Sequence, residues 1–540
     1  MKIHFRNQTS FSLLLLVAIT ASIAPTSAQN STAYIPAEKI FLNCGASSSN
    51  MSSPDGLSWE GDDGLSYSPS IQNTLSATAI VQNPSVPAIP YITARISKTP
   101  YTYSFPVTPG RKFIRLHFYP SNFTSTDYNI NFTISFSFFS VSVGPYTLLN
   151  NFSALLTAQA LNFDYIRKEF SVNISSNTLN VTFTPSPASK NAFAFVNGIE
   201  IVSMPQFFGG SDAFSQPQIV GTTTTLPIDE HTAFETVARL NVGGSTVSAT
   251  ADSGLYRKWD HDSIYIYGAA VGVTYASDPN VTIQYSDTLP EYIAPPVVYS
   301  TARSMGPNAS VNLNYNLTWI ITVDAGFSYF VRLHFCEIKS PFMKVNMRVF
   351  DVFINNMTAI QGLDVITQTN QVGLGAPLKL DFIVSFPNTS ASSQQAIWVS
   401  LHPYIDSKPE YYDAELNGLE IFKLNDSTGN LYGQNMSNQQ TVDTGKKKRI
   451  RHFLFLAIGV CGPVLVILLL AFIALRRWRR RHKLILQSSV SSLSSRSNQG
   501  RRITGDWGRR VRKGLQGRDR RRVNLRCGQA RKPTFRPGGA

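Results

Sequence analysis

Hydrophobic and polar positions alternate along most of the chain, with the period of two that is typical of half-buried β-strands. Stretches rich in Val, Ile, Phe, Tyr and Thr recur between turns rich in Gly, Pro, Asn and Ser. Examples are residues 112–119, 180–184, 330–338 and 348–354. Amphipathic helical patterns are scarce by comparison. The pattern therefore predicts an all-β fold built mostly of antiparallel sheet.

Two apolar segments depart from this alternation. Residues 11–23 are a short apolar run behind a basic start, and small residues precede Gln29, so residues 1–28 are expected to be a secretory signal peptide. An uncleaved anchor is the alternative. Residues 453–475 carry no charge and are long enough to cross a hydrocarbon core of about 30 Å. They are predicted to form a transmembrane helix.

Basic residues flank this predicted span on both sides, so the signal peptide sets the orientation. We expect residues 29–452 outside the cell and 476–540 inside, a single-pass type I arrangement at the plasma membrane. The net charge of +15 averages two unlike parts. After residue 445 there are 26 Lys and Arg against two Asp, which leaves 22 basic and 31 acidic residues before it. The basic tail is expected to meet anionic inner-leaflet lipid, and no nucleic-acid partner is expected.

Asn-X-Ser/Thr sequons mark the same boundary, because they stop before the predicted span. The candidate glycosylation sites are Asn30, Asn50, Asn122, Asn131, Asn151, Asn173, Asn180, Asn280, Asn308, Asn316, Asn356, Asn388, Asn425 and Asn435. Only Cys44 and Cys336 lie in the predicted ectodomain, so it is not a disulfide scaffold. These two either pair as a disulfide or stay separately buried, and both alternatives are open.

Short motifs occur twice in the same order, at offsets of 198 to 220 residues. The pairs are Leu42-Asn43 with Leu240-Asn241, Thr93-Ala94-Arg95 with Thr301-Ala302-Arg303, Arg115-Leu116-His117-Phe118 with Arg332-Leu333-His334-Phe335, Phe139-Ser140-Val141 with Phe350-Asp351-Val352, and Asn197-Gly198-Ile199-Glu200-Ile201 with Asn417-Gly418-Leu419-Glu420-Ile421. The repeat predicts two tandem β-sandwich domains, 29–205 and 226–424, with a linker at 206–225. An extracellular juxtamembrane segment, 425–452, follows.

The repeated motifs also have simple structural interpretations. In Arg-Leu-His-Phe the alternation places the Arg and His side chains on one face of a strand. His117 and His334 have no second ligand at metal spacing, so we expect an ordinary polar strand face and no metal. The Asn-Gly pairs are read as turns in which Gly supplies a positive φ.

Several motifs together resemble the ectodomains of plant FERONIA-type receptor kinases of the malectin-like class. They are residues 41–45, 85–95, 105–113, 144–149 and 194–200 in the first half, and 350–355 and 416–425 in the second. The resemblance extends over about residues 36–475. It implies two malectin-like β-sandwiches on a plant plasma membrane. It further implies recognition of cell-wall polysaccharide of the pectin type, or of a peptide of the rapid alkalinisation factor class with a GPI-anchored co-receptor. No cofactor is implied.

The tail departs from that family, whose members continue into a Ser/Thr kinase. Residues 476–540 contain no Gly-rich phosphate loop, catalytic Asp or metal-binding Asp, and they have too little apolar content to fold. We therefore expect a receptor-like protein that is not itself an enzyme. The open alternatives are a truncated receptor and a reading frame lost after the span.

Three functions remain to be weighed: a ligand-binding receptor without its own kinase, a carbohydrate-binding protein that tethers membrane to wall, and an extracellular glycosidase. No motif marks a carboxylate pair for the last. For sugar stacking, Tyr101, Tyr103, Tyr119 and Tyr146 are candidates for an exposed platform, and the alternative is that they are core aromatics. Ligand-contact residues are otherwise not identified by the sequence.

Overall fold

The computed structural model describes residues 33–433, except 48–49, 70–73, 126–127, 210–215, 269–270 and 387–392. The predicted signal peptide, span and tail lie outside these residues. Within them strands dominate and helices are short, which confirms the all-β fold class. No helix of this part of the chain is long and apolar enough to cross a membrane.

The first half of the fold contains the strands up to residue 203. They are β1 (Lys39–Asn43), β2 (Met51–Ser52), β3 (Ser58–Gly61), β4 (Leu75–Ala79), β5 (Thr93–Ser97), β6 (Tyr101–Pro106), β7 (Gly110–Phe118), β8 (Phe123–Ser125), β9 (Ile130–Phe132), β10 (Phe139–Val143), β11 (Tyr146–Phe152), β12 (Ile166–Ile174), β13 (Thr178–Pro185), β14 (Ala194–Val196) and β15 (Gly198–Ser203). The helices are α2 (Ala88–Tyr91) and α3 (Ala154–Leu161). The sheet β11-β10-β13-β6 faces the strands around β7 across an apolar core.

The second half repeats this plan. Its strands are β16 (Gln218–Ile219), β17 (Phe234–Asn241), β18 (Asp260–His261), β19 (Val273–Ala276), β20 (Thr301–Ser304), β21 (Leu317–Asp324), β22 (Ser328–Phe335), β23 (Phe350–Ile354), β24 (Met357–Leu363), β25 (Leu378–Ser385), β26 (Gln394–Pro403), β27 (Glu415–Leu416) and β28 (Gly418–Leu424). The helices are α4 (Pro296–Tyr299), α5 (Ala309–Asn312) and α6 (Val365–Gln368). The sheet β21-β26-β23-β24 lies across the second core from β22 and β28.

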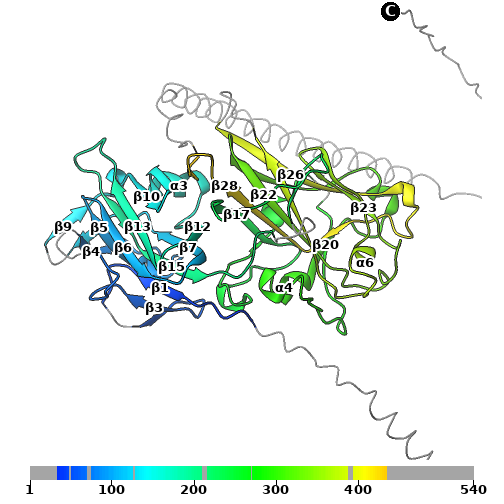
Figure 1. Cartoon of the computed structure of the whole chain (residues 1–540), viewed down its shortest axis with the longest axis horizontal. Coiled ribbons are helices and arrows are strands. Elements are labelled where there is room, and N and C mark those ends of the chain that lie inside the picture. Colours follow the sequence, from blue (N-terminus) through cyan, green and yellow to red (C-terminus); the bar gives the residue numbers. More distant parts are fainter. Residues whose placement is uncertain are drawn as a thin grey trace, which may run out of the picture. The chain divides into compact units, whose positions relative to one another are not determined.

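One sheet runs through both halves, in the order β16-β25-β22-β28-β17-β12-β7-β15-β1-β3-β2. The halves join where β12 pairs antiparallel with β17, with Phe170 opposite Glu235 and Ser171 opposite Phe234 (Figure 1). Each half also has its own sandwich core. The division into two domains with boundaries at 205 and 226 stays a prediction, because the halves share this sheet.

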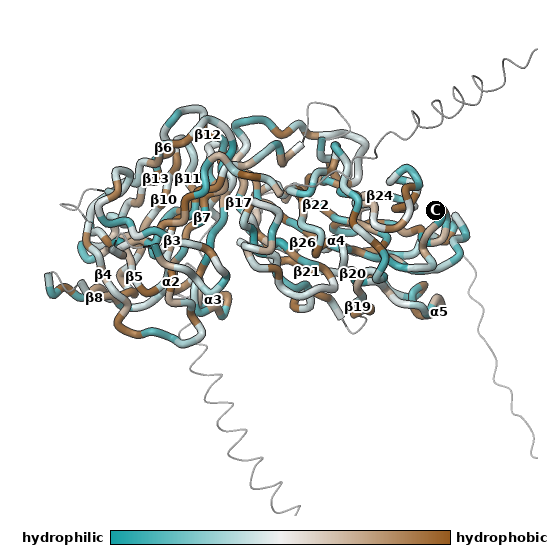
Figure 2. The backbone as a smooth tube through the Cα atoms, turned by 90° about the horizontal axis from the view of Figure 1, so that it is seen from below, coloured by the Kyte–Doolittle hydropathy of each residue, from teal (hydrophilic) through white to brown (hydrophobic). Residues whose placement is uncertain are grey.

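Three hydrophobic cores explain why strands such as β7 are buried on both faces. Ile114, Leu116 and Phe118 point into the first sandwich core. Phe113 points to the opposite side, into a central core that both halves build. Figure 2 shows hydrophobic stretches on strands such as β7 and β17 and hydrophilic ones along many connecting loops. The predicted alternation is therefore present, but its polar face is covered and not exposed to water.

The segments around the junction are part of the fold. In the predicted linker, Phe207 and Phe208 are buried in the central core, and β16 pairs in parallel with β25. Beyond β28, residues 425–433 return to the first half, and we call them the C-terminal strap. Thr147 of β11 donates to the carbonyl of Gly429 and accepts from the amide of Leu431, both at 3.0 Å. The Leu431 side chain is buried in the first core.

Candidate functional site: a cleft in the first half and a buried polar network

The two Arg-Leu-His-Phe motifs lie directly beside the two Asn-Gly motifs. On β7 and β15, Arg115 pairs with Glu200 in the strand register, and on β22 and β28, Arg332 pairs with Glu420. The sequence repeat is therefore a repeat of strand pairing. Because the polar face of these strands meets the central core, its charges must be satisfied within the protein.

Each motif histidine is held between a tyrosine and a glutamate. His117 Nδ1 lies 2.7 Å from the Tyr91 hydroxyl, and its Nε2 lies 2.7 Å from Glu200. In the second half, His334 Nδ1 lies 2.8 Å from the hydroxyl of Tyr299. Burial lowers the pKa of both imidazoles, against the opposing effect of their glutamates. The described residues contain no group of three or more His, Cys, Asp or Glu arranged to hold a metal ion, and the two histidines bridge their tyrosine and glutamate partners.

The prediction that the Asn-Gly pairs are turns is wrong. Both glycines begin strands, and neither has a positive φ. A Cβ at Gly198 would lie 2.7 Å from Pro90, and one at Gly418 would lie 2.8 Å from Val298, so glycine is required here by close packing. Asn197 is buried and its amide donates to the carbonyls of Tyr91 and Thr93.

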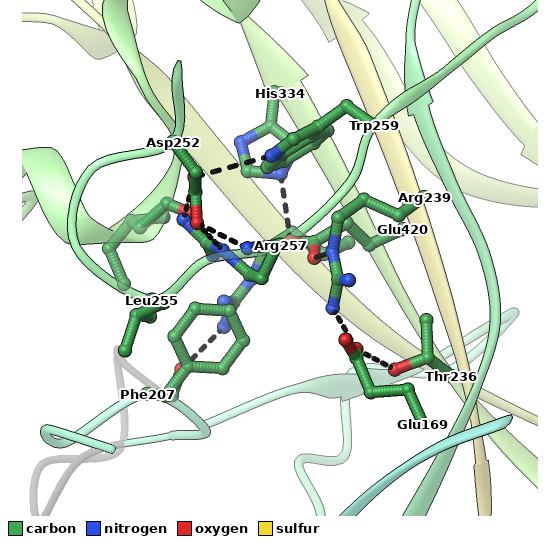
Figure 3. Close-up of polar contacts among 12 residues, drawn as sticks. Glu169, Phe207, Thr236, Arg239, Asp252, Leu255, Arg257, Trp259, His334 and Glu420 are labelled. Carbon is green, nitrogen blue, oxygen red and sulfur yellow. Dashed lines mark hydrogen bonds and ion pairs between the residues drawn. The ribbon is translucent and has the colours of Figure 1, made fainter. Parts of the chain in front are cut away.

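Charged side chains cross the junction between the halves (Figure 3). Arg239 contacts Glu169 of the first half at 2.8 Å and Glu420 of the second at 2.7 Å. Arg115 contacts Glu169 as well, at 2.6 Å. Burial would raise the pKa of Glu169, but the charges of Arg239 and Arg115 hold it well below its usual range. The network is closed to solvent, so it positions the two halves and does not present a ligand site.

The four tyrosines singled out from the sequence are buried. Tyr103 is fully buried and donates to Asp62 at 2.6 Å, while Tyr101 stacks on Phe183 with ring centroids 5.0 Å apart. Tyr146 donates to the carbonyl of His231 at 3.0 Å. The expectation of an exposed stacking platform is therefore corrected in favour of core aromatics, because the protein covers the rings of Tyr101, Tyr103 and Tyr146 and leaves little of Tyr119 exposed. Tyr119 also lines a cleft.

That cleft lies in the first half and has a volume of about 200 Å³. Its lining combines two tyrosines with small apolar and amide side chains: Gln82, Asn83, Pro84, Val86, Ala88, Tyr91, Ile92 and Tyr119. The Tyr119 hydroxyl donates to the Val81 carbonyl at 3.0 Å and accepts from the Asn83 amide at 3.1 Å. The cleft is smaller than the roughly 300–1,000 Å³ of typical small-molecule sites, but it shares with them an apolar lining and a few fixed polar groups.

A carboxylate at the rim adds charge to this cleft. Asp164 accepts from the side-chain amide of Asn83 at 3.1 Å and from the Ser85 hydroxyl at 2.6 Å, and these contacts are exposed. Exposed apolar side chains of Val81 and Phe163 lie next to these residues in the chain. Sequence reasoning missed the rim, because Asn83 and Asp164 are 81 residues apart and no motif links them.

The two ectodomain cysteines are free thiols, and each is buried in its own half. Cys44 lies in the first core and Cys336 in the central core. Burial raises the pKa of both thiols above the usual range. Of the two alternatives left open by the sequence, the structure has separate burial.

Most described sequons lie at the surface, but glycosylation itself stays a prediction. Asn50, Asn122, Asn131, Asn151, Asn180, Asn280, Asn308, Asn316 and Asn356 are exposed. Asn173 and Asn425 are partly buried, and Asn30, Asn388 and Asn435 lie outside the described residues. The carbonyl of the Asn425 side chain accepts from the backbone of Ala233 at 2.7 Å.

Comparison with known proteins identifies this arrangement. The profile of the Malectin-like domain matches residues 42–424. The chain is 47% identical over 480 residues to Receptor-like protein kinase FERONIA of Arabidopsis thaliana, which covers 87% of this chain and 52% of that protein. It is 39% identical to Receptor-like protein kinase ANXUR2 of the same plant, covering 82% and 50%. The chain thus spans about half the length of the curated relatives it matches.

Solved structures extend the similarity over the described fold. The crystal structure of plant Receptor-like Kinase FER is 50% identical, with a TM-score of 0.67, and the match covers 74% of this chain and 99% of that one. A structure of the plant peptide RALF23 in complex with FER and LLG2 matches with the same TM-score and coverage at 49% identity. The extracellular domain of ANXUR1 from Arabidopsis thaliana matches at 39% identity, a TM-score of 0.67 and 99% coverage of that chain. The chain therefore belongs to the malectin-like family, in the group formed by the ectodomains of FERONIA-type receptor kinases.

Proposed function

We propose that the chain is a receptor-like protein whose malectin-like ectodomain recognises a secreted peptide of the rapid alkalinisation factor class together with a GPI-anchored co-receptor. The observation that carries the proposal is the match over 99% of the FER chain that was solved with RALF23 and LLG2, at 49% identity. That identity extends over the whole of the matched chain. The proposal concerns recognition, because the family profile ends at residue 424.

The proposal places this ectodomain at the plasma membrane of a plant cell. Residues 1–28 and 453–475 support it, because one has the pattern of a signal peptide and the other the length and hydropathy of a span. Residues 29–452 would then face the wall, and the basic residues after 475 would meet anionic lipid. The kinase activity for which the relatives are named is not proposed for this chain.

A pull-down in solution tests the peptide proposal. The full chain in detergent is mixed with a synthetic peptide of the RALF23 class, with and without the purified LLG2-type co-receptor. We expect stable capture of both partners only when all three are present. Failure of capture at micromolar concentrations, with FERONIA as the positive control, would contradict the proposal.

The cleft supports a second candidate function, the binding of cell-wall carbohydrate. Tyr91 and Tyr119 line its wall, each with a small part of its side chain exposed, while Asn83 and Asp164 supply hydrogen-bonding groups at its rim. Sugar sites combine these two elements, since ring faces are apolar and hydroxyls need polar partners. A tether to pectin and recognition of a peptide are compatible in one ectodomain.

Substitution at the rim separates the two functions. We expect Asp164→Asn to weaken binding of pectic oligosaccharides about tenfold, since a charge-assisted hydrogen bond is worth about 1.5–3 kcal/mol. Capture of the peptide and co-receptor should not change. Asp63→Asn removes the same charge from another exposed site of the first half and serves as the matched control. Equal oligosaccharide binding by the wild type and Asp164→Asn would exclude the cleft.

A further inference from the structure

A second buried polar cluster lies in the second half, away from both the cleft and the junction. Its centre is Arg348, whose side chain is 1% exposed. The guanidinium contacts Glu337 at 3.0 Å, Asp413 at 3.1 Å and Glu415 at 2.5 Å. Three carboxylates thus share one cation, and with all of them ionised the cluster would have a net charge of −2.

No further cation in the described residues balances this charge. Tyr275 of β19 donates its hydroxyl to Glu415 and accepts from Arg348 at 3.2 Å, but it is neutral. The ammonium of Lys339 lies 5.8 Å from the centre of the Tyr275 ring, but this side chain is exposed and is paired with Asp278 at 3.6 Å. The other titratable groups on the packed elements are Asp364, Tyr411 and Arg303 of β20. Arg303 is positive, but it is paired with Asp262 at 2.6 Å. One oxygen of Glu415 and Nε of Arg348 are buried without a hydrogen-bond partner.

The same position of the first half is apolar, which shows that the fold does not need charge here. In the pairing of β27 with β20, Leu416 lies opposite Arg303, and the preceding residue, Glu415, lies opposite Ser304. In the equivalent pairing of β14 with β5, Val196 lies opposite Arg95, and the preceding residue, Phe195, lies opposite Ile96. Phe195 therefore corresponds to Glu415 and, two residues earlier, Phe193 corresponds to Asp413; both Phe side chains are buried in the first core.

Ionising such a cluster is unfavourable, because buried like charges repel each other and each loses its hydration. Taking up protons relieves both effects without moving the chain. We propose that the Arg348 cluster is a pH-sensitive element. Under acidic conditions it stabilises the packing of segments 337–348 and 411–416 in the second half, and near neutral pH it destabilises that packing. This goes beyond ligand recognition and does not depend on which ligand binds.

The direction of the pKa shifts agrees with this geometry. Burial raises the pKa of Glu337 to about 7, and burial raises the pKa of Asp413 and Glu415 above the usual range of carboxyls. A group whose pKa is higher in the folded state adds stability below its unfolded pKa of about 4.3 and loses it as pH rises through the folded value. The affected window is therefore about pH 4.5 to 7.5, the opposite of ordinary acid denaturation.

Hydrogen–deuterium exchange on the full chain tests the proposal. After correction for the intrinsic effect of pH, we expect residues 337–348 and 411–416 to exchange at least tenfold faster at about pH 7.5 than at about pH 5, since each unit of pKa shift crossed in this range contributes a factor of about ten. The first-half segment 193–196 is the internal control and should not change. Equal corrected rates at both pH values would overturn the proposal.

A variant then assigns the effect to the cluster. Glu415→Gln removes one ionisable group while it keeps the shape, so the pH response of 337–348 should fall at least threefold. Glu60→Gln, a partly exposed acid of β3, is the matched control and should keep the wild-type response. If Glu415→Gln is not recovered folded, Glu337→Gln takes its place. A full wild-type response in the folded variant would overturn the assignment.

Discussion

Asn417 illustrates how much of this fold depends on single buried polar side chains. Its amide donates to the carbonyls of Tyr299 and Thr301, and its oxygen accepts from the amide of Cys336 at 2.7 Å. The side chain thus ties β28 to the end of β22 and to the segment before β20. Asn197 makes the equivalent contacts in the first half, with Tyr119 in place of Cys336. This explains why the same dipeptide occurs in both halves.

Removal of this side chain should be costly. We expect Asn417→Ala to destabilise the protein by about 3 kcal/mol, because several buried backbone groups lose their partner and water cannot replace it. Thermal unfolding followed by circular dichroism measures the effect. Asn314→Ala is the control, since Asn314 is exposed and its side chain donates to the carbonyl of Ser310 four residues away, and it should change the midpoint little. Equal midpoints for the two variants would contradict this interpretation.

At the residue scale, the sequence repeat predicted which positions are structurally important, but it did not predict their burial or their contacts. The repeat marked Arg115, His117 and Asn197, and the alternation placed Arg115 and His117 on one strand face, as the structure has them. Alternation cannot tell whether a polar face meets water or another protein layer, so their burial was not predictable. The cleft rim was missed for a related reason, since Asn83 and Asp164 meet only through the tertiary fold.

At the scale of elements, β12 and β17 carry the connection between the halves. Only two residue pairs are in register between them, yet side chains extend the contact. Lys168 of β12 contacts Glu235 of β17 at 2.6 Å, and Lys423 of β28 contacts the same glutamate at 2.5 Å. Glu235 and Lys423 are buried and Lys168 is partly exposed, so Glu235 is strongly coupled to its cations. Protonation of this carboxylate would leave a buried cation without its counter-charge.

This network predicts how the junction responds to acid. Against the effect of burial, neighbouring cations lower the pKa of Glu200, Glu235 and Glu420 to about 2. A group with a lowered pKa adds stability above its unfolded value of about 4.3, and that stability is lost as pH falls through the folded value. We therefore expect the melting temperature to drop steeply between about pH 4 and pH 2.

Calorimetry across this range checks the prediction. Glu420→Gln should make the melting temperature fall less steeply at acidic pH, because one of the coupled carboxylates is gone. The same variant should be less stable than the wild type at neutral pH. Glu230→Gln, a largely exposed acid, should keep the wild-type profile. A melting temperature that is constant down to about pH 2.5 would show that these carboxylates are not coupled to folding.

At the scale of the whole molecule, the two halves are joined by a core as well as by a sheet. Phe208 stacks on Phe234 with ring centroids 3.9 Å apart, and Phe207 lies 4.7 Å from the guanidinium of Arg332. The backbone carbonyl of Phe207 also accepts from Arg332 at 2.9 Å. The Gly-, Ser- and Thr-rich composition of this region predicted a linker, and composition could not reveal that two aromatic residues at its start fill a shared core.

Truncation of one of these residues should uncouple the halves. We expect Phe208→Ala to lower stability by about 3–5 kcal/mol, since it leaves a cavity between them. The single thermal transition expected for the wild type should broaden or split in differential scanning calorimetry. Phe163→Ala removes an exposed ring of the first half and is the matched control. A sharp, unshifted transition for Phe208→Ala would contradict a shared core.

The C-terminal strap has a mechanical consequence. The covalent chain leaves the second half at β28, yet Leu431 is anchored in the first half beside β11. A tensile load that reaches residue 433 from the C-terminal side would therefore act first on the first half, and would pass to β28 only after the strap had peeled away. We therefore expect two load thresholds in series, the first of which would release the strap while both sandwiches stay folded.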